Sequence, residues 1–370
     1  MFTGLKVLEL ASVLAGPSVG QFFAELGAEV IKVENKMAGG DITRTWKSAG
    51  EHTDDRSAYF CSVNWGKKSI ALDLSDKRDQ DVVLRLAVRA DIIIASFKPG
   101  DAEKLGVAYQ QLSPRNPQLI YGQITGYGSA NDRVGYDAVL QAETGFMDLN
   151  GVADGPPIKM PVALIDLLAA HQLKEGMLLA LLNKERTGEG SLVEVSLIQA
   201  AVASLANQAS NWLVGKQLPV RQGSTHPNIA PYGDSFETQD GKRILLAIGN
   251  DRQFNDLCDV LKLDLAKSES LFSSNQKRVE HRLALNDLLR REIISKNSSV
   301  LLDAMNTKKI PAGLIQNMKE VFDMPEAKEI LMQGDGITGV RNFVGGKTVT
   351  QLIPPPHFGE HNDEILRLLK

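Results

Sequence analysis

Asp166 stands at the head of an almost wholly apolar stretch, PVALIDLLAAHQLKEGMLLALLNKERTG, which covers 161–188. Apolar residues nearly surround the helix predicted over 167–182, so most of its circumference should be buried. A carboxylate at this position has two interpretations. Asp is a common helix N-cap, which accepts backbone N–H bonds in the first turn and contributes about 1 kcal/mol. Alternatively, the helix dipole and the free N–H groups favour the anion, which would then remain ionised and nucleophilic at neutral pH.

Three common kinds of site are not supported by the sequence. A dinucleotide site needs G-x-G-x-x-G after the first strand, whereas the loop here reads SVLAGPS. The 6 histidines are scattered along the chain, so we predict no metal site. A serine hydrolase would carry G-x-S-x-G, and the chain has no such motif.

The composition indicates a soluble globular protein of 370 residues, 43% hydrophobic and 23% charged, which is long enough for about two domains. The net charge is −4 and no block of like charge stands out, so we expect a small-molecule partner and neither nucleic acid nor a membrane. Cys61 and Cys258 are far apart, without a CxxC motif or a histidine cluster, which favours reduced structural thiols. Neither an export signal nor an uncharged apolar run of about 18 residues is evident. We therefore expect a cytoplasmic protein.

The elements that would position Asp166 alternate as in a parallel α/β fold. The apolar patterns predict strands at 5–11, 28–34, 69–74, 91–97 and 119–125, and helices at 17–26 and 80–90. The first strand, the first helix and the second strand form a βαβ unit. The first half of the chain is therefore predicted to be Rossmann-like.

A second, smaller α/β domain is predicted in the later part of the chain. A strand and then a helix follow over 191–214, and the next segment, 215–233, is rich in Gly, Pro, Ser and Asn. Beyond it come a strand at 243–249, a helix with Asp251 near its start, and an amphipathic helix at 279–295. We expect a large domain at 1–214, completed by about 330–370, a linker at 215–224 and a small domain at 225–325.

Seven segments along nearly the whole chain carry a further pattern: GLKVLELASVLAGP, GAEVIKVEN…GGDITR, NWGKKSIALDL, LGVAYQQLSPRNPQLIYGQITGYG, YDAVLQAETGFM, LLNKERTGEGSLVEVSL and FGEHNDEIL. In this order they resemble the successive signatures of the family III CoA-transferases, which include formyl-CoA transferases and α-methylacyl-CoA racemases. Each segment is weak alone, and together they are highly specific. The resemblance implies an interlaced homodimer in which each chain threads through its partner.

In that family an Asp at the head of a helix, ahead of the ALL…ERTG segment, forms covalent intermediates, and Asp166 matches it. The resemblance implies that Asp166 attacks the thioester of an acyl-CoA, that an aspartyl-CoA thioester follows a mixed anhydride, and that a second carboxylate then takes the CoA. A CoA thioester would thus be a substrate, with no permanently bound cofactor. Ala170 stands where the family usually has Gly, which would alter how closely the acyl group packs.

The resemblance also implies residues that bind CoA or substrate: Val13, Ala15, Leu72, Ser96, Phe97 and Lys98, with Lys104 and Arg133 as cations for the phosphates and Tyr136 and Asp137 near the thioester. Ser96 and Lys98 depart from the family's more frequent Asn-x-Arg-Pro-Gly. Surface Lys and Arg are common, so simple solvated side chains remain an alternative for the two cations. The Tyr136–Asp137 pair could equally be structural.

Gly249 and Asn250 resemble a segment that approaches the active site of the partner subunit, where they could bring donors to an acyl oxygen. An ordinary strand-to-helix turn with Asp251 as its cap is the alternative.

The function predicted from the sequence is CoA transfer from an acyl-CoA donor to a small carboxylic acid, with a succinyl-type dicarboxylate favoured. A racemase is the nearest alternative, but it uses a His-Asp pair where this chain has Tyr136 and Asp137, so the imidazole base is missing. A catalytically silent CoA-binding protein is the other alternative, and the retained Asp166 argues against it.

Overall fold

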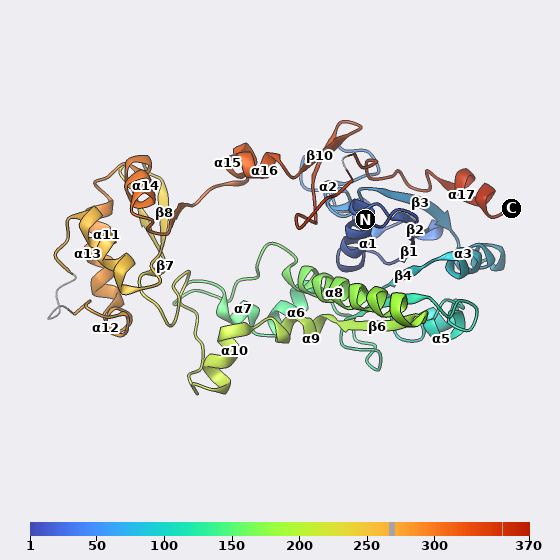
Figure 1. Cartoon of the computed structure of the whole chain (residues 1–370), viewed down its shortest axis with the longest axis horizontal. Helices are drawn as coiled ribbons and strands as arrows, with labels where there is room; N and C mark the ends of the chain where they lie inside the picture. Colours follow the sequence, from blue (N-terminus) through green and yellow to red (C-terminus); the bar gives the residue numbers. More distant parts are fainter. Residues whose placement is uncertain (266–270, 350) are drawn as a thin grey trace. The chain divides into compact units, whose positions relative to one another are not determined.

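The computed structural model describes residues 1–265, 271–349 and 351–370 (Figure 1). The chain forms two compact units, of which the first comprises 1–144, 160–206 and 326–370 and the second comprises 145–159 and 207–325. The second unit thus includes the short segment 145–159 that precedes the Asp166 helix in sequence. The domain bounds expected from the sequence, with a large domain at 1–214 and about 330–370 and a small domain at 225–325, stay a prediction.

The first unit is built on a six-stranded sheet in the order β3-β2-β1-β4-β5-β6, and every strand pair in it is parallel. The strands are β1 (Lys6–Leu10), β2 (Glu29–Asn35), β3 (Lys67–Leu72), β4 (Ile92–Ala95), β5 (Ile120–Thr125) and β6 (Ser191–Ser196). β4 is apolar and buried at every position, as expected for a strand covered on both faces. The predicted parallel α/β fold is confirmed.

The remaining elements of the first unit are α1 (Ala15–Glu25), η1 (Lys36–Ala38), η2 (Ile42–Thr45), α2 (Ala58–Cys61), α3 (Lys77–Arg89), α4 (Asp101–Lys104), α5 (Tyr109–Leu112), α6 (Asp137–Glu143), α8 (Leu164–Thr187), α9 (Leu197–Ala203), β10 (Leu331–Gly334), β11 (Ile337–Val340) and α17 (Asn362–Leu368). α16 (Pro325–Lys328) spans the boundary between the units.

The side chains of β1 alternate between the faces of the sheet. Leu8 and Leu10 join the core that includes Val83 of α3 and Ile365 of α17, whereas Glu9 faces Gly20 of α1.

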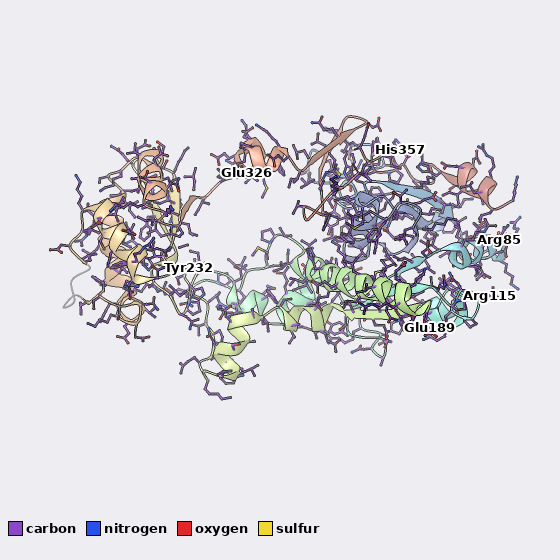
Figure 2. All side chains as sticks on the ribbon, in the orientation of Figure 1. Arg85, Arg115, Glu189, Tyr232, Glu326 and His357 are labelled. Carbon is purple, nitrogen blue, oxygen red and sulfur yellow. The ribbon has the colours of Figure 1, made fainter. Side chains whose placement is uncertain are left out.

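The C-terminal segment returns to the edge of this sheet. The Gly359 N–H donates to Ser69 Oγ at 2.9 Å, and the Ala71 N–H donates to Asn362 Oδ1 at 2.8 Å. At the start of this C-terminal segment, His357 (labelled in Figure 2) contacts the carboxylate of Asp55. The segment therefore completes the unit around β3.

The second unit carries a three-stranded antiparallel sheet in the order β7-β8-β9, formed by β7 (Tyr232–Glu237), β8 (Arg243–Ala247) and β9 (Ala312–Leu314). Its helices are α7 (Phe146–Leu149), α10 (Ala206–Leu213), α11 (Asp251–Leu261), α12 (Asn275–Glu280), α13 (Arg282–Ile293), α14 (Ser298–Thr307) and α15 (Met318–Asp323). The first residue of α10, Ala206, still belongs to the first unit. The helix predicted at 279–295 is confirmed over 282–293 as α13, but its predicted start is wrong, because the backbone leaves helical geometry at His281 and divides α12 from α13.

None of the helices within the described residues combines the length and the apolar character that a membrane crossing requires.

Candidate active site

Asp166 is the third residue of α8, not its N-cap. The helix begins at Leu164, and its N-cap is Ala163, which has no side-chain acceptor. The N–H of Ile165 in the first turn donates instead to Oδ1 of Asp137, at 2.8 Å. The capping interpretation of Asp166 is therefore wrong, because a carboxylate from another helix takes that role.

The Asp166 side chain is buried, with a relative exposure of 8%, and has no hydrogen-bond partner among the described residues. Burial, followed by the nearby carboxylate of Asp137, raises the pKa of Asp166 to about 7. Loss of hydration on burial therefore opposes the ionised form of Asp166 that the helix dipole favours.

Asp137, the first residue of α6, is also buried, and both of its carboxylate oxygens are engaged. Oδ1 accepts the Ile165 N–H, and Oδ2 accepts Nε2 of Gln141 at 2.7 Å. The Oε1 atom of Gln141 in turn accepts the N–H of Met160 at 2.8 Å. Asp137 and Gln141 thus connect α6 to the chain that leads into α8.

Asp166 lines a cavity of about 180 Å³ within the first unit. The predicted site residues that line the same cavity are Val13, Ala15, Ser96, Phe97, Lys98, Arg133, Tyr136 and Asp137. The structure therefore brings together predicted site residues from four separate stretches of the sequence. Tyr136 is 56% exposed, so its phenol is open to solvent in the isolated chain.

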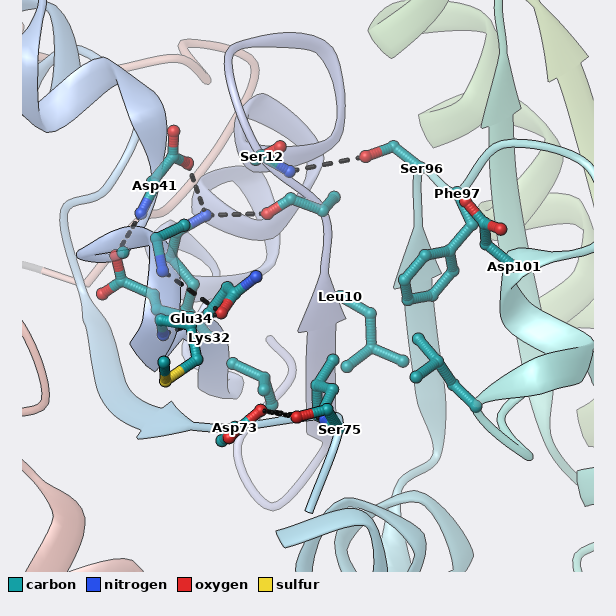
Figure 3. A pocket seen from close by; sticks show the side chains of 18 of the residues that line it. Leu10, Ser12, Lys32, Glu34, Asp41, Asp73, Ser75, Ser96, Phe97 and Asp101 are labelled. Carbon is teal, nitrogen blue, oxygen red and sulfur yellow. Dashed lines mark hydrogen bonds and ion pairs between the residues drawn. The ribbon is translucent and has the colours of Figure 1, made fainter. Parts of the chain in front are cut away.

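A larger cavity of about 820 Å³ lies at the carboxyl ends of β1, β2 and β4 (Figure 3). Ser96, Phe97 and Lys104 are the predicted site residues in its lining. Ser12, Ser96 and Phe97 line both cavities, so the two adjoin at the ends of β1 and β4. Clefts at the carboxyl ends of parallel strands are where α/β sheets bind ligands.

Three predicted residues lie outside both cavities. Leu72 ends β3 and is 3% exposed in the hydrophobic core. Gly249 and Asn250 belong to the second unit, where Oδ1 of Asn250 caps α11 by accepting the Gln253 N–H at 2.9 Å. The helix cap at this turn is therefore Asn250, and the alternative that assigned it to Asp251 is wrong.

The candidate cations differ in the partners that they already have. Lys104 pairs with Asp101 at 2.9 Å, and Arg133 pairs with Glu143 at 2.6 Å. Lys98 has no ion pair among the described residues and is exposed at the Asp166 cavity. Lys98 is therefore the most available of these cations for an anionic ligand.

Tyr59 of α2 is a site neighbour that the sequence analysis missed. Burial raises the pKa of Tyr59 to about 12, with further contributions from the charges of Asp166 and Asp137. Its ring contacts that of Trp46 edge to face, with the ring centroids 5.2 Å apart. No recognised pattern surrounds Tyr59 in the sequence, so only the fold places it near the two acids.

A buried charge network supports the loop after β1. Nζ of Lys32 lies 2.9 Å from Glu9 and 2.9 Å from Asp41, and Nζ of Lys67 lies 2.7 Å from Glu9 (Figure 3 shows Lys32 with Asp41). Oδ2 of Asp41 also accepts the N–H of Val13 at 3.2 Å. Val13 has φ of 72°, a strained backbone conformation for a β-branched residue. The network thus helps to hold Val13 in the wall of the Asp166 cavity.

One group of possible metal ligands occurs in the described residues, formed by Asp54, Asp55 and His357. Arg56 already pairs with Asp54 at 2.6 Å, and Arg44 pairs with Asp55 at 3.3 Å. These cations neutralise the carboxylates, so the group is poorly suited to a metal ion, and we assign no metal site.

The chain matches a family model, several relatives and a solved structure over nearly its whole length. A family model described as CoA-transferase family III matches residues 2–362. The chain is 36% identical to a succinate–glutarate CoA-transferase of Agrobacterium fabrum, over 100% of this chain and 95% of that protein. It is 34% identical to the human succinyl-CoA:glutarate CoA-transferase, over 98% of this chain and 85% of that protein. A crystal structure of a CAIB/BAIF family protein from Brucella suis matches with a TM-score of 0.87 and 37% identity, covering 100% of this chain and 99% of that one.

Proposed function

Since the chain belongs to CoA-transferase family III and is an acyl-CoA:carboxylate CoA-transferase, we propose that it transfers CoA from a succinyl-type acyl-CoA to a small carboxylic acid through a covalent intermediate on Asp166. The observation that carries this proposal is the state of Asp166. Its carboxylate is buried, lacks a hydrogen-bond partner among the described residues and opens to a cavity shared with Val13, Lys98 and Tyr136. A desolvated carboxylate of this kind is a competent nucleophile.

In the first proposed half-reaction, an oxygen of ionised Asp166 attacks the thioester carbon, the C–S bond breaks, and CoA leaves as a thiolate. The product on Asp166 is a mixed anhydride. The thiolate then attacks the Asp166 carbonyl carbon of that anhydride and releases the donor acid as a carboxylate. Asp166 now carries CoA as a thioester, and no net proton has been taken up or released.

In the second half-reaction, the acceptor carboxylate attacks the aspartyl thioester and expels the CoA thiolate. The thiolate attacks the acceptor's carbonyl in the resulting anhydride, which forms the new acyl-CoA and restores Asp166. Both anhydrides would hydrolyse in water, so the energy of the thioester is kept only if water is excluded. The burial of Asp166 supports this requirement.

We further propose that CoA occupies the two adjoining cavities. The larger cavity at the strand ends would take the nucleotide part, with Lys104 in its lining, and the thioester would reach Asp166 through the smaller one. Lys98, which has no ion pair among the described residues, would offer its ammonium group to a phosphate, whereas Arg133 would first have to leave Glu143. The names of two relatives, which specify succinate or succinyl-CoA with glutarate, support dicarboxylic acids as donor and acceptor.

Trapping of the intermediate tests the proposed function. Incubation with succinyl-CoA and then hydroxylamine is expected to convert Asp166 into a hydroxamate and to inactivate the enzyme, because the aspartyl thioester is far more electrophilic than a resting carboxylate. Peptide mass mapping should locate the change within 165–168. Glutarate added before hydroxylamine should reduce the modification by consuming the intermediate. An unmodified Asp166 under conditions that support CoA exchange would rule out covalent catalysis.

We also propose that the enzyme acts as an interlaced homodimer, to which the partner's Gly249 and Asn250 would bring donors near the acyl group. The apolar surface of α8 supports this arrangement. Leu179 and Leu182 are 68% and 50% exposed in the single chain, on a helix whose apolar residues lie on all sides. Helices of this kind are normally covered, and burial of each leucine would contribute about 1.5–3 kcal/mol.

Light scattering should therefore report twice the mass of one chain at micromolar concentration, without dissociation on dilution, since interlaced chains separate only by unfolding. Leu179→Glu should lower the yield of the dimer. A stable folded monomer of the wild-type chain would contradict the proposal.

A further inference from the structure

The first turn of α8 is capped from outside the helix. Ala163, the N-cap residue, has no side-chain acceptor, and Oδ1 of Asp137 takes the Ile165 N–H at 2.8 Å. Two neighbouring N–H groups are engaged by the backbone, because Leu164 donates to the Val162 carbonyl at 2.8 Å and Leu167 donates to the Ala163 carbonyl at 3.2 Å. The N–H groups of Leu164, Ile165 and Leu167 are therefore already occupied.

Asp137 is itself held firmly in place. Its second carboxylate oxygen accepts Nε2 of Gln141 at 2.7 Å, and Gln141 is fully buried. Gln141 also accepts the Met160 N–H at 2.8 Å, so it links α6 to the chain that enters α8. The Asp137 carboxylate cannot turn away from the Ile165 N–H without breaking these bonds.

This arrangement determines what Asp166 can do. An Asp in the first turn of a helix ordinarily bends back to accept a free backbone N–H, which lowers the reactivity of its oxygens. Here Asp137 occupies the Ile165 N–H, and the Asp166 carboxylate, in the wall of the cavity, has no hydrogen bond to any of the described residues.

We propose that Asp137 is a positioning residue for CoA transfer: it caps α8 in place of Asp166 and so keeps the Asp166 carboxylate unbonded and available to the thioester. The inference rests on the proposed function, in which Asp166 is the nucleophile. It gives Asp137 a role that acts through Asp166 and needs no contact between Asp137 and the substrate.

The negative charge of Asp137 has a second effect on Asp166. After burial, it is the neighbour that raises the pKa of Asp166 to about 7, and a more basic carboxylate is a stronger nucleophile once ionised. Tyr59 of α2 stays neutral in this range, because its own pKa is raised to about 12. Lys98 and Arg133 line the same cavity, while Lys174, two turns further along α8, contacts Ser18.

The test compares the pH dependence of kcat/KM for the wild-type enzyme, Asp137→Asn and Asp137→Ala. The Asn variant keeps an oxygen for the Ile165 N–H but loses the charge, so the acidic limb of the profile should move down by about one pH unit. The Ala variant also frees the Ile165 N–H, to which Asp166 can then bond. Its plateau should fall by about 10- to 100-fold, with little change in the KM for succinyl-CoA.

Asn297→Ala is the matched control, because Asn297 caps α14 in the second unit through the Ser299 N–H. It should lower the melting temperature slightly and leave the pH profile unchanged. If both Asp137 variants keep the wild-type profile, the positioning role is wrong. If the Ala variant fails to fold, the shift of the profile in the Asn variant decides.

The wild-type trapping experiment separates this inference from the proposed function. Hydroxylamine modification of Asp166 together with unshifted profiles would overturn the role of Asp137 alone. Absence of any modification in the wild type would overturn the nucleophile and the inference that depends on it.

Discussion

Asn in place of Asp166 should abolish CoA transfer and, at pH 8, make the protein more stable. The amide cannot form the anhydride or the thioester, so kcat should fall by at least about a thousandfold, as for other nucleophile removals. The fold should persist, because Asp137 and not Asp166 caps α8. Binding of CoA should change little, since the proposed nucleotide cavity does not include Asp166.

The gain in stability follows from the pKa of Asp166. The folded-state pKa of about 7 lies above the ordinary value of about 3.9 in the unfolded chain. The folded state therefore binds this proton more tightly, and the stabilisation is complete below about pH 4 and lost as the pH rises through 7. At pH 8 ionisation of Asp166 lowers the free energy of unfolding of the wild-type protein by on the order of 4 kcal/mol, and a neutral Asn has no such effect.

Urea unfolding at pH 4.5 and pH 8 measures this difference. The two proteins should be close in stability at the lower pH, and Asp166→Asn should be the more stable at pH 8. A variant that keeps near-native turnover would contradict the assignment of the nucleophile. A variant that is less stable than the wild type at pH 8 would show that Asp166 has a structural partner.

The sequence was sufficient to predict the parallel sheet, because each strand has a recognisable apolar pattern of its own. β4 is apolar at all positions, as a strand buried on both faces must be, and the short segments between β1, α1 and β2 leave only a right-handed βαβ unit. The resemblance along the chain then pointed to Asp166 and to eight of the other residues that line its cavity.

The sequence could not predict what surrounds Asp166. An Asp ahead of an apolar run is the usual pattern of an N-cap, but the cap comes from Asp137, on a different helix, and a local pattern contains no information about such a tertiary contact. The same limit applies to the cations. Lys104 and Arg133 are visible in the sequence, whereas their pairing with Asp101 and Glu143 depends on the fold.

The buried charges of the sheet were also beyond prediction. Glu9 in KVLEL and Lys32 in EVIKVEN interrupt otherwise apolar strands, and a sequence pattern would allow either residue to face solvent. In the structure both are fully buried and paired, together with Lys67 of β3. Their positions opposite one another depend on the register of three neighbouring strands.

Gln in place of Glu9 is expected to lower the free energy of unfolding by about 3–5 kcal/mol at pH 7, because removal of one partner leaves buried charges uncompensated. Glu9 contacts Lys32 at 2.9 Å and Lys67 at 2.7 Å, and all three side chains have a relative exposure of 0%. Burial already lowers the pKa of Lys67 to about 8 despite the attraction of Glu9. Without Glu9, that pKa should fall further.

The pH dependence of this loss of stability tests whether the charge of Lys67 causes it. A lysine whose folded-state pKa lies below its unfolded value binds fewer protons when folded, so stability rises with pH from the folded pKa up to about 10.4. The deficit of Glu9→Gln should therefore be smaller at pH 9 than at pH 7, once Lys67 is neutral in the folded protein. Urea unfolding at both pH values measures this change.

Glu29→Gln is the matched control, since Glu29 pairs with Lys68 at 2.8 Å on the same sheet but its side chain is 38% exposed. Exposed pairs contribute at most about 1 kcal/mol, so this variant should be nearly as stable as the wild type. Only Glu9→Gln should also raise the KM for acyl-CoA, because Lys32 and Asp41 would no longer hold the Val13 N–H as firmly. Equal stability losses in the two variants would show that the buried network contributes no more than a surface ion pair.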